Sequence, residues 1–258
     1  MQGAGNNETN IKQSGRADRE ITHGRKLAAK DPELVWGWGT PAGRLRAIRR
    51  AKIIASGARL GLGVRALEIG CGTGLFTEMF AQTGAQLVAL DISADLLEIA
   101  RTRGVPADKV EFLEKRFEDS DFVGAFDAVI GSSVLHHLDV EKAFPRIFEL
   151  LKPGGFMSFA EPNMLNPQIL VEKNMPWLKK HMGDSPDETA FVRWQIQSHL
   201  LNVGFEKVEV TPFDWLHPIT PEPLINLVSE MGHWLERVPL IKEFAGSLFI
   251  RARRPLLP

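Results

Sequence analysis

Short apolar runs alternate with amphipathic stretches between residues 64 and 160, and this alternation restricts the fold of the chain most strongly. The apolar runs are Val64–Ile69, Leu87–Asp91, Val110–Leu113, Phe126–Gly131 and Gly155–Ala160. Helical spacing of apolar residues separates them at Leu75–Gln82, Ala94–Arg103 and Val140–Leu151. Such alternation predicts a parallel sheet with helices on both faces, and continuous apolar runs are typical of strands buried on both sides.

The alternation loosens after Pro162, but the chain predicts two further strands. Phe205–Val210 follows a helical stretch at Glu188–Asn202, and Ser247–Ala252 closes the pattern. We therefore expect a single α/β domain over residues 21–258, preceded by a disordered tail at residues 1–20. Within the domain we expect an N-terminal cap segment at 21–60 and lid insertions at 163–187 and 213–246, the second with a helix at Glu222–Glu236.

Three glycines follow directly on the first apolar run, in Glu68-Ile69-Gly70-Cys71-Gly72-Thr73-Gly74. Glycine allows tight turns and a close approach of the main chain to a ligand. A dinucleotide fingerprint, G-x-G-x-x-G, needs glycine at position 75, which is Leu75 here, so the spacing argues against NAD or FAD. The carboxylate of Glu68 suits a ligand that carries positive charge and no phosphate.

Four segments resemble, in the right order, the motifs of the class I S-adenosylmethionine (SAM)-dependent methyltransferases. They are Leu67–Gly74, Leu90-Asp91-Ile92-Ser93, the region from Phe126-Asp127-Ala128 to Val134-Leu135-His136-His137-Leu138, and Leu151-Lys152-Pro153-Gly154-Gly155. The resemblance covers about residues 64–162. It implies a Rossmann-like, seven-stranded, mostly parallel sheet with an antiparallel last strand, one lid insertion after strand five, another between strands six and seven, and SAM as cofactor.

The same resemblance implies which residues bind the cofactor. Asp91 lies about 20 residues beyond the glycine turn, the spacing that places a carboxylate on ribose hydroxyls. Further cofactor contacts are implied for Glu68, Gly70, Cys71, Gly72, Gly74, Ile92 and Ser132. The family often has Gly-Asp-Ala after strand three, where this chain has Lys115-Arg116-Phe117-Glu118. Because the acid is missing at Arg116, we expect the amide of Phe117, with Glu118, to contact the adenine.

His136 and His137 follow strand four, where the transferred methyl group is expected. A histidine can take a proton from a hydroxyl at neutral pH, so either is a candidate catalytic base, and the alternative is that one packs against the sheet. Glu161 and Asn163 follow strand five and are candidates to orient the substrate, or are turn residues. Trp177 belongs to an apolar segment expected to roof the substrate.

The composition limits the classes of partner and substrate that the chain is expected to bind. The net charge is -1, and the single cysteine, Cys71, lies in the glycine turn. A basic excess, a nucleophilic cysteine or an Asn/Asp-Pro-Pro-aromatic motif would indicate a nucleic-acid substrate, and Gly131-Ser132-Ser133-Val134 stands where that motif would be. One cysteine and no apolar stretch of about 20 residues favour a cytoplasmic protein without stable membrane insertion, while peripheral membrane contact and the oligomeric state stay open. No metal site is predicted.

The sequence thus predicts methyl transfer from SAM to a small, apolar, hydroxyl-bearing acceptor, with O-methylation favoured. Two alternatives stay open. One is a SAM-binding regulator without catalysis. The other is methylation of carbon or nitrogen in a lipid-like or quinone-like molecule.

Overall fold

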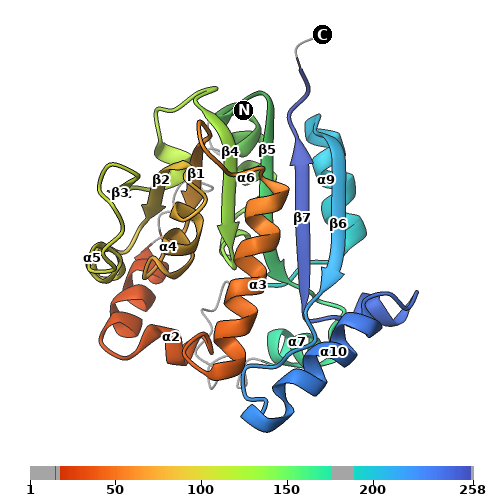
Figure 1. Cartoon of the computed structure of the whole chain (residues 1–258). Helices are drawn as coiled ribbons and strands as arrows, with labels where there is room; N and C mark the ends of the chain where they lie inside the picture. The colour runs from red at the N-terminus through yellow and green to blue at the C-terminus, as the bar shows by residue number, and fades with distance from the viewer. Residues whose placement is uncertain (1–14, 16–17, 176–188, 257–258) are drawn as a thin grey trace.

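A seven-stranded sheet forms the centre of the computed structural model, which describes residues 15, 18–175 and 189–256 (Figure 1). The strands are β1 (Arg65–Ile69), β2 (Gln86–Asp91), β3 (Val110–Glu114), β4 (Phe126–Ser132), β5 (Leu151–Pro162), β6 (Glu206–Phe213) and β7 (Ser247–Arg253). The helices are α2 (Pro32–Val35), α3 (Pro41–Gly57), α4 (Leu75–Ala81), α5 (Ala94–Arg101), α6 (Val140–Leu150), α7 (Pro167–Asn174), α9 (Arg193–Val203) and α10 (Ile225–Leu235), with one more over residues 18–28. Short 3-10 helices are η1 (Phe117–Asp119), η2 (Leu135–His137), η3 (Glu222–Leu224) and η4 (Ile241–Phe244).

The strand order is β3-β2-β1-β4-β5-β7-β6, with β7 antiparallel to both of its neighbours. In Figure 1 the arrow of β7 points against those of β4 and β6. This confirms the predicted seven-stranded, mostly parallel sheet with an antiparallel last strand. The chain winds outward from β1 to β3 and then returns to place β4 beside β1, so the sheet has its switch point between these two strands, where α/β proteins bind ligands.

Two apolar layers cover the sheet, and each belongs to a different set of helices. Side chains of α3, α4 and α5 pack on one face, around Ile54, Phe80 and Leu97. Side chains of α6 and α9 pack on the other, around Phe144 and Leu200. Figure 1 shows α3 crossing in front of the sheet and α9 behind β6. The prediction of helices on both faces is therefore confirmed.

Strand β5 begins four residues earlier than expected. The sequence predicted a helix up to Leu151 and a strand only from Gly155, but pairing already starts with Leu151 opposite Phe126. The register then shifts, so that Ala128 lies opposite Phe156. Gly154 adopts φ +81°, a value that glycine tolerates, and the extra residues are accommodated as an irregularity within the strand.

Two peripheral segments also differ from expectation. Residues 18–20 are helical, so the helix over 18–28 begins inside the predicted tail of residues 1–20. The helix expected at Glu222–Glu236 is split into η3 and α10, and most of its apolar side chains are exposed, including Leu227, Met231 and Trp234. Within the described residues, no helix is long and apolar enough to span a membrane.

Candidate functional site

A cavity of about 720 Å³ lies at the carboxyl ends of the parallel strands, at the switch point of the sheet. Two halves can be distinguished by the strands that supply them. The β1–β3 half is lined by Gly70–Gly72, Asp91–Ser93 and Lys115–Glu118. The β4–β7 half is lined by Ser132, His136, His137, residues 214–219, Arg46, Arg50 and Ser247. The helix over residues 18–28, the segment around α2, and α7 cover both halves.

The backbone angle and the neighbours of each glycine in the turn show why glycine is needed at that position. Gly70 has φ +66°, and a Cβ there would lie 2.4 Å from a methyl carbon of Val134. Gly72 has φ +52° and faces the ring of Trp36. Gly74 has φ +76°, begins α4 and packs against Ala100 on α5, and it does not line the cavity. Gly70 and Gly72 thus bring main chain to the cavity surface, whereas Gly74 allows two helices to approach.

Glu68, expected to bind the cofactor, lies outside the cavity lining. Its side chain is buried on the α4 side of the sheet beneath the turn, and Oε2 has no hydrogen-bond partner among the described residues. Burial raises the pKa of this carboxyl to about 8, so the group is mostly neutral at pH 7. The cause of the departure is strand alternation: Gly70 reaches the cavity from the turn, whereas Glu68 still belongs to β1 and faces a helix.

Asp91, at the end of β2, lines the cavity as expected, and so does Ile92. Its Oδ2 accepts the amide proton of Gly72 at 2.7 Å, and its Oδ1 accepts that of Ser93 at 2.9 Å. Burial raises the pKa of Asp91, although these amide hydrogen bonds work in the opposite direction. The carboxylate therefore joins the glycine turn to the N-terminus of α5 and presents its edge to the cavity.

The segment after β3 contributes Arg116, Phe117 and Glu118 to the lining. Phe117 is buried and starts η1. The Nε atom of Arg116 lies 3.8 Å from Oε2 of Glu118 and 3.6 Å from Oδ2 of Asp119. Cys71 also lines this half, and burial raises the pKa of its thiol well above the ordinary value. A thiolate is therefore not available there at neutral pH.

His136 and Glu161 form a buried pair where β4 and β5 end. The Nδ1 atom of His136 lies 2.7 Å from Oε2 of Glu161, and His136 lines the cavity. The other oxygen, Oε1, accepts the amide protons of Val134 and Leu135, each at 3.0 Å. Burial by itself would raise the pKa of Glu161, but the hydrogen bond and charge of His136 and the two amides bring it below its ordinary value.

Glu161 was expected to contact substrate, but it does not line the cavity and acts on His136 instead. His137, the second candidate base, lines the cavity with its Nδ1 atom 3.2 Å from Oε2 of Glu20. Glu20 belongs to the helix over residues 18–28, so His137 contacts the cover of the site. Ser132 lines the cavity, and its buried hydroxyl has no hydrogen-bond partner among the described residues.

Asn163, also expected to contact substrate, is committed elsewhere. It is buried, and its side-chain amide donates to the carbonyls of Glu243 and Ala245 at 2.8 and 2.7 Å, while its oxygen accepts the amide proton of Leu165. It fixes η4 against the end of β5 and does not line the cavity. Trp177 lies outside the described residues. The lining includes residues of α7 and of the loop at 214–219, which belong to the two expected lid insertions, and it includes no residue of α10.

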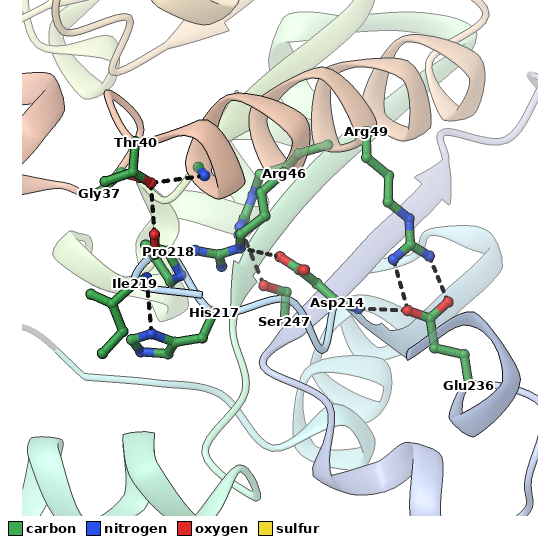
Figure 2. Close-up of polar contacts among 12 residues, drawn as sticks. Gly37, Thr40, Arg46, Arg49, Asp214, His217, Pro218, Ile219, Glu236 and Ser247 are labelled. Carbon is green, nitrogen blue, oxygen red and sulfur yellow. Dashed lines mark hydrogen bonds and ion pairs between the residues drawn. The ribbon is translucent and has the colours of Figure 1, made fainter. Parts of the chain in front are cut away.

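Sequence reasoning missed a group of charged residues on α3. Arg46 and Arg50 line the β4–β7 half, one helical turn apart. Figure 2 shows Arg46 directed at Asp214. Arg46 donates from Nε to Oδ2 of Asp214 at 2.9 Å, and Arg50 donates to the hydroxyl of Ser247 at 3.2 Å. The available signal was an arginine in the buried stripe that includes Ala47, Ala51 and Ile54.

Within the part of the chain that the structure describes, no group of three or more His, Cys, Asp or Glu side chains could hold a metal ion. The polar groups of the cavity are instead arranged as a carboxylate and amides at one end and as a histidine, a hydroxyl and two guanidinium groups at the other.

Residues 67–159 match the methyltransferase domain family. A ubiquinone biosynthesis O-methyltransferase of Xanthomonas oryzae is 36% identical over 125 residues, which are 46% of this chain and 52% of that protein. The chain thus spans about half the length of the curated relative it matches.

Two solved structures share the fold. N-methyltransferase NodS from Bradyrhizobium japonicum, in complex with S-adenosylhomocysteine (SAH), superposes with a TM-score of 0.60 at 19% identity, over 91% of this chain and 98% of NodS. The [4+2]-cyclase SpnF superposes with a TM-score of 0.61 at 20% identity, over 91% of this chain and 95% of SpnF. By its motifs, its matched segment and its strand order, the chain contains a methyltransferase domain over residues 67–159 that is similar to those of the class I SAM-dependent methyltransferases.

Proposed function

We propose that this protein transfers the methyl group of SAM to a hydroxyl oxygen of a small, apolar acceptor. The observation that carries the proposal is the pair of His136 and Glu161 at the ends of β4 and β5, because His136 lines the same cavity as Asp91 and the glycine turn. One half of the cavity thus offers the groups that a nucleoside requires. The other offers a group that can remove a proton.

The residues of the β1–β3 half fit SAM. Asp91 presents a carboxylate that can accept hydrogen bonds from ribose hydroxyls, and Gly70 and Gly72 leave space for a close approach of the ligand. The buried hydroxyl of Ser132, which lacks a partner among the described residues, lies where a polar part of the ligand would satisfy it. A cavity of about 720 Å³ has room for a cofactor and part of an acceptor.

The acceptor would contact a largely apolar wall. Trp36, Trp38, Phe76 and Leu216 line the cavity, and the Trp38 and Phe76 rings pack edge to face with centroids 5.5 Å apart. Such a wall excludes water and aligns an apolar molecule, and alignment is the main requirement of a direct displacement at a methyl carbon. SAM, when bound, supplies that methyl group on a sulfonium whose departure leaves a neutral thioether.

His136 is the proposed general base. Because Glu161 accepts a hydrogen bond at Nδ1, the imidazole is held in one orientation and its proton is favoured on Nδ1. The lone pair is then on Nε2, which can take the proton of an acceptor hydroxyl as the oxygen attacks. The carboxylate of Glu161 stabilises the resulting imidazolium, the role that an acid performs beside a catalytic histidine elsewhere. An oxygen nucleophile benefits from this device more than a neutral amine does.

Single-turnover methylation of a panel of phenols and catechols, each with and without a carboxyl group, tests the proposal with labelled SAM. We expect His136→Gln to lower the rate by roughly 10²–10⁴-fold, the usual contribution of a general base, while SAH affinity stays unchanged. The matched control is His233→Gln, since His233 is exposed on α10 and outside the lining. A His136 variant with wild-type rates would refute the base role. Tight SAM binding without turnover across the panel would favour the SAM-binding regulator.

A further inference from the structure

Arg50 is a buried cation with few compensating groups. Its side chain is 2% exposed, its Nη1 atom donates to the hydroxyl of Ser247, and its Nε atom has no hydrogen-bond partner among the described residues. The aromatic faces of Trp38 and Phe213 lie 5.6 and 5.8 Å from the guanidinium carbon and stabilise the charge only in part. A guanidinium in such surroundings is normally paired with an anion, because burial of an unpaired charge is costly.

The carboxylates near Arg50 are already engaged. Asp214 is bound to Arg46, and Glu161 is bound to His136 and two amides. Burial and the neighbouring charge of Arg46 lower the pKa of Arg50 to about 10, so it remains protonated at pH 7. Arg46, Arg50 and Asp214 therefore carry one net positive charge between them, and a carboxylate of a ligand could pair with Arg50 directly, which neither Asp214 nor Glu161 does.

This group lies on the acceptor side of the cavity. Asp91 ends β2, whereas Ser247 begins β7, and β1, β4 and β5 lie between these two strands. At about 4.8 Å per step, four steps separate β2 from β7 by about 19 Å. A cofactor whose ribose is held at Asp91 would direct its methyl group toward β4, so Arg50 lies beyond the reacting atoms, next to the wall that the acceptor would contact.

We propose that Arg50, assisted by Arg46, binds a carboxylate of the acceptor, so that the substrate class is an apolar hydroxy acid and not a neutral phenol. This inference rests on the proposed function, because it assigns a ligand to the same cavity. A guanidinium can bind a carboxylate through two parallel hydrogen bonds, which fixes orientation as well as charge. The acceptor would then be held at its acidic end by Arg50 while its hydroxyl is presented to His136.

If Arg50 serves a ligand and not the fold, Arg50→Met should keep the helix packing while it removes a buried, unpaired charge. We expect its Tm to equal that of the wild type or to exceed it by roughly 2–4 °C. This measurement also shows that the variant is folded before any binding assay.

The test is calorimetric titration of SAH-loaded protein with matched acid and methyl-ester pairs, 3,4-dihydroxybenzoate and 3,4-dihydroxycinnamate each with its ester. We expect the wild type to bind the acids about 10–100-fold more tightly than the esters, the usual worth of a charged hydrogen bond. Arg50→Met should lose this preference and Arg50→Lys should keep part of it. The control Arg44→Met, exposed on the same helix and outside the lining, should keep it in full.

Each other outcome separates the two proposals. Equal affinity of the SAH-loaded wild type for acids and esters, or binding of neither, would overturn the inference and leave SAM binding intact. An Arg50→Met variant that binds SAH itself more weakly, with the acid preference unchanged, would overturn it too, by assigning Arg50 to the carboxylate of the cofactor. Failure of the wild type to bind SAH would overturn the proposed function, and the inference with it.

Discussion

In the β1–β3 half of the cavity the polar groups come from one continuous part of the chain, residues 70–118, whereas the β4–β7 half joins side chains from distant segments. Arg50 and Ser247, which touch in that half, are 197 residues apart in the chain. The first half is therefore a local construction of turns and strand ends. The second exists only when α3, β5, β6 and β7 are packed together.

Each half also contains one buried carboxyl group behind its wall, and the two differ in protonation. Glu68, beneath the glycine turn, has no ion-pair partner among the described residues and is mostly neutral at pH 7, whereas Glu161 is bound to His136 and two amides and is ionised. The difference teaches that burial alone does not make a carboxyl group functional. A buried carboxylate that stays charged has a partner, and that partner lines the cavity.

The largest expected effect comes from the turn of the first half. Gly70→Ala would place a Cβ 2.4 Å from Val134 at φ +66°, so both backbone strain and a steric clash oppose it. We expect a loss of about 2–5 kcal/mol of stability and loss of SAH binding. The matched control is Gly104→Ala, which has φ +68° but no neighbour within 4 Å, and should cost only about 1–2 kcal/mol. Denaturant unfolding measures both, and equal losses would contradict the role of Val134.

Glu68→Gln should remove a pH dependence from the first half. A carboxyl group whose pKa is raised to about 8 on folding contributes stability below its ordinary pKa of 4.5, and this contribution is lost as the pH rises through about 8. The glutamine variant keeps the shape of the neutral acid without that loss. Relative to the wild type, we expect the free energy of unfolding of the variant to increase from about pH 5 to pH 8, by at most about 1.4 kcal/mol per pH unit, and its Tm to rise with it. A constant difference across this range would show that Glu68 is ionised.

Glu161→Gln should have the opposite signature in the second half. Its pKa is lowered on folding, so its contribution is present above the ordinary pKa and is lost as the pH falls through the folded value. We expect the wild type to be more stable than the variant at neutral pH and this advantage to shrink in acid below about pH 4.5. Thermal melts of both variants over the same pH series provide the comparison. Parallel curves for Glu68→Gln and Glu161→Gln would remove the proposed distinction between the two halves.

Asp91→Asn should affect only the β1–β3 half. The amide side chain can accept from one of the two backbone N–H groups, Gly72 or Ser93, but it presents an N–H group to the other. We expect SAH affinity to fall about 10–100-fold, which corresponds to the loss of a charged hydrogen bond. Asp108→Asn, on an exposed residue outside this cavity, is the matched control. If acid preference in the other half changed as much as SAH affinity, the halves would not be independent.

The success of sequence reasoning follows the same division. The glycine turn, Asp91 and the segment after β3 line the cavity, because strand periodicity and local spacing place them at one edge of a sheet, and their contacts with a cofactor stay a prediction. Glu68 and Gly74 were placed in the cofactor site by the same motif, yet strand alternation and helix packing turn them away from the cavity. The motif records the turn as a whole and does not distinguish residues that touch a ligand from residues that shape the turn.

In the β4–β7 half, the sequence identified candidate residues by their type but did not show which of them form pairs. His136 and Glu161 were both candidates, but their pairing depends on β4 and β5 ending side by side, and no spacing along the chain reports it. No sequence motif indicated Arg50, because an arginine in a helix is usually exposed. Only the packing of α3 against the sheet makes it a buried cation.

The smallest expected effects come from two helix caps, one in each half, and their contrast is the sharpest test of independence. The hydroxyl of Thr40 accepts the amide proton of Gly43 at 3.0 Å and donates to the carbonyl of Pro218 at 2.7 Å (Figure 2). Ser93 caps α5 by accepting the amide proton of Leu96. Substitution of either by alanine should cost about 0.5–2 kcal/mol, a fall in Tm of a few degrees.

The two cap variants should differ in what they bind. Thr40 connects α3 to the loop at 214–219 that lines the β4–β7 half, so Thr40→Ala should weaken acceptor binding and leave SAH affinity unchanged. Ser93 lines the β1–β3 half beside Asp91, so Ser93→Ala should weaken SAH binding and leave acid preference unchanged. Calorimetry with SAH, and then with the acid and ester pairs, measures both. Because the two losses of stability are expected to be similar, a difference in which ligand is affected can arise only from where each cap lies in the cavity.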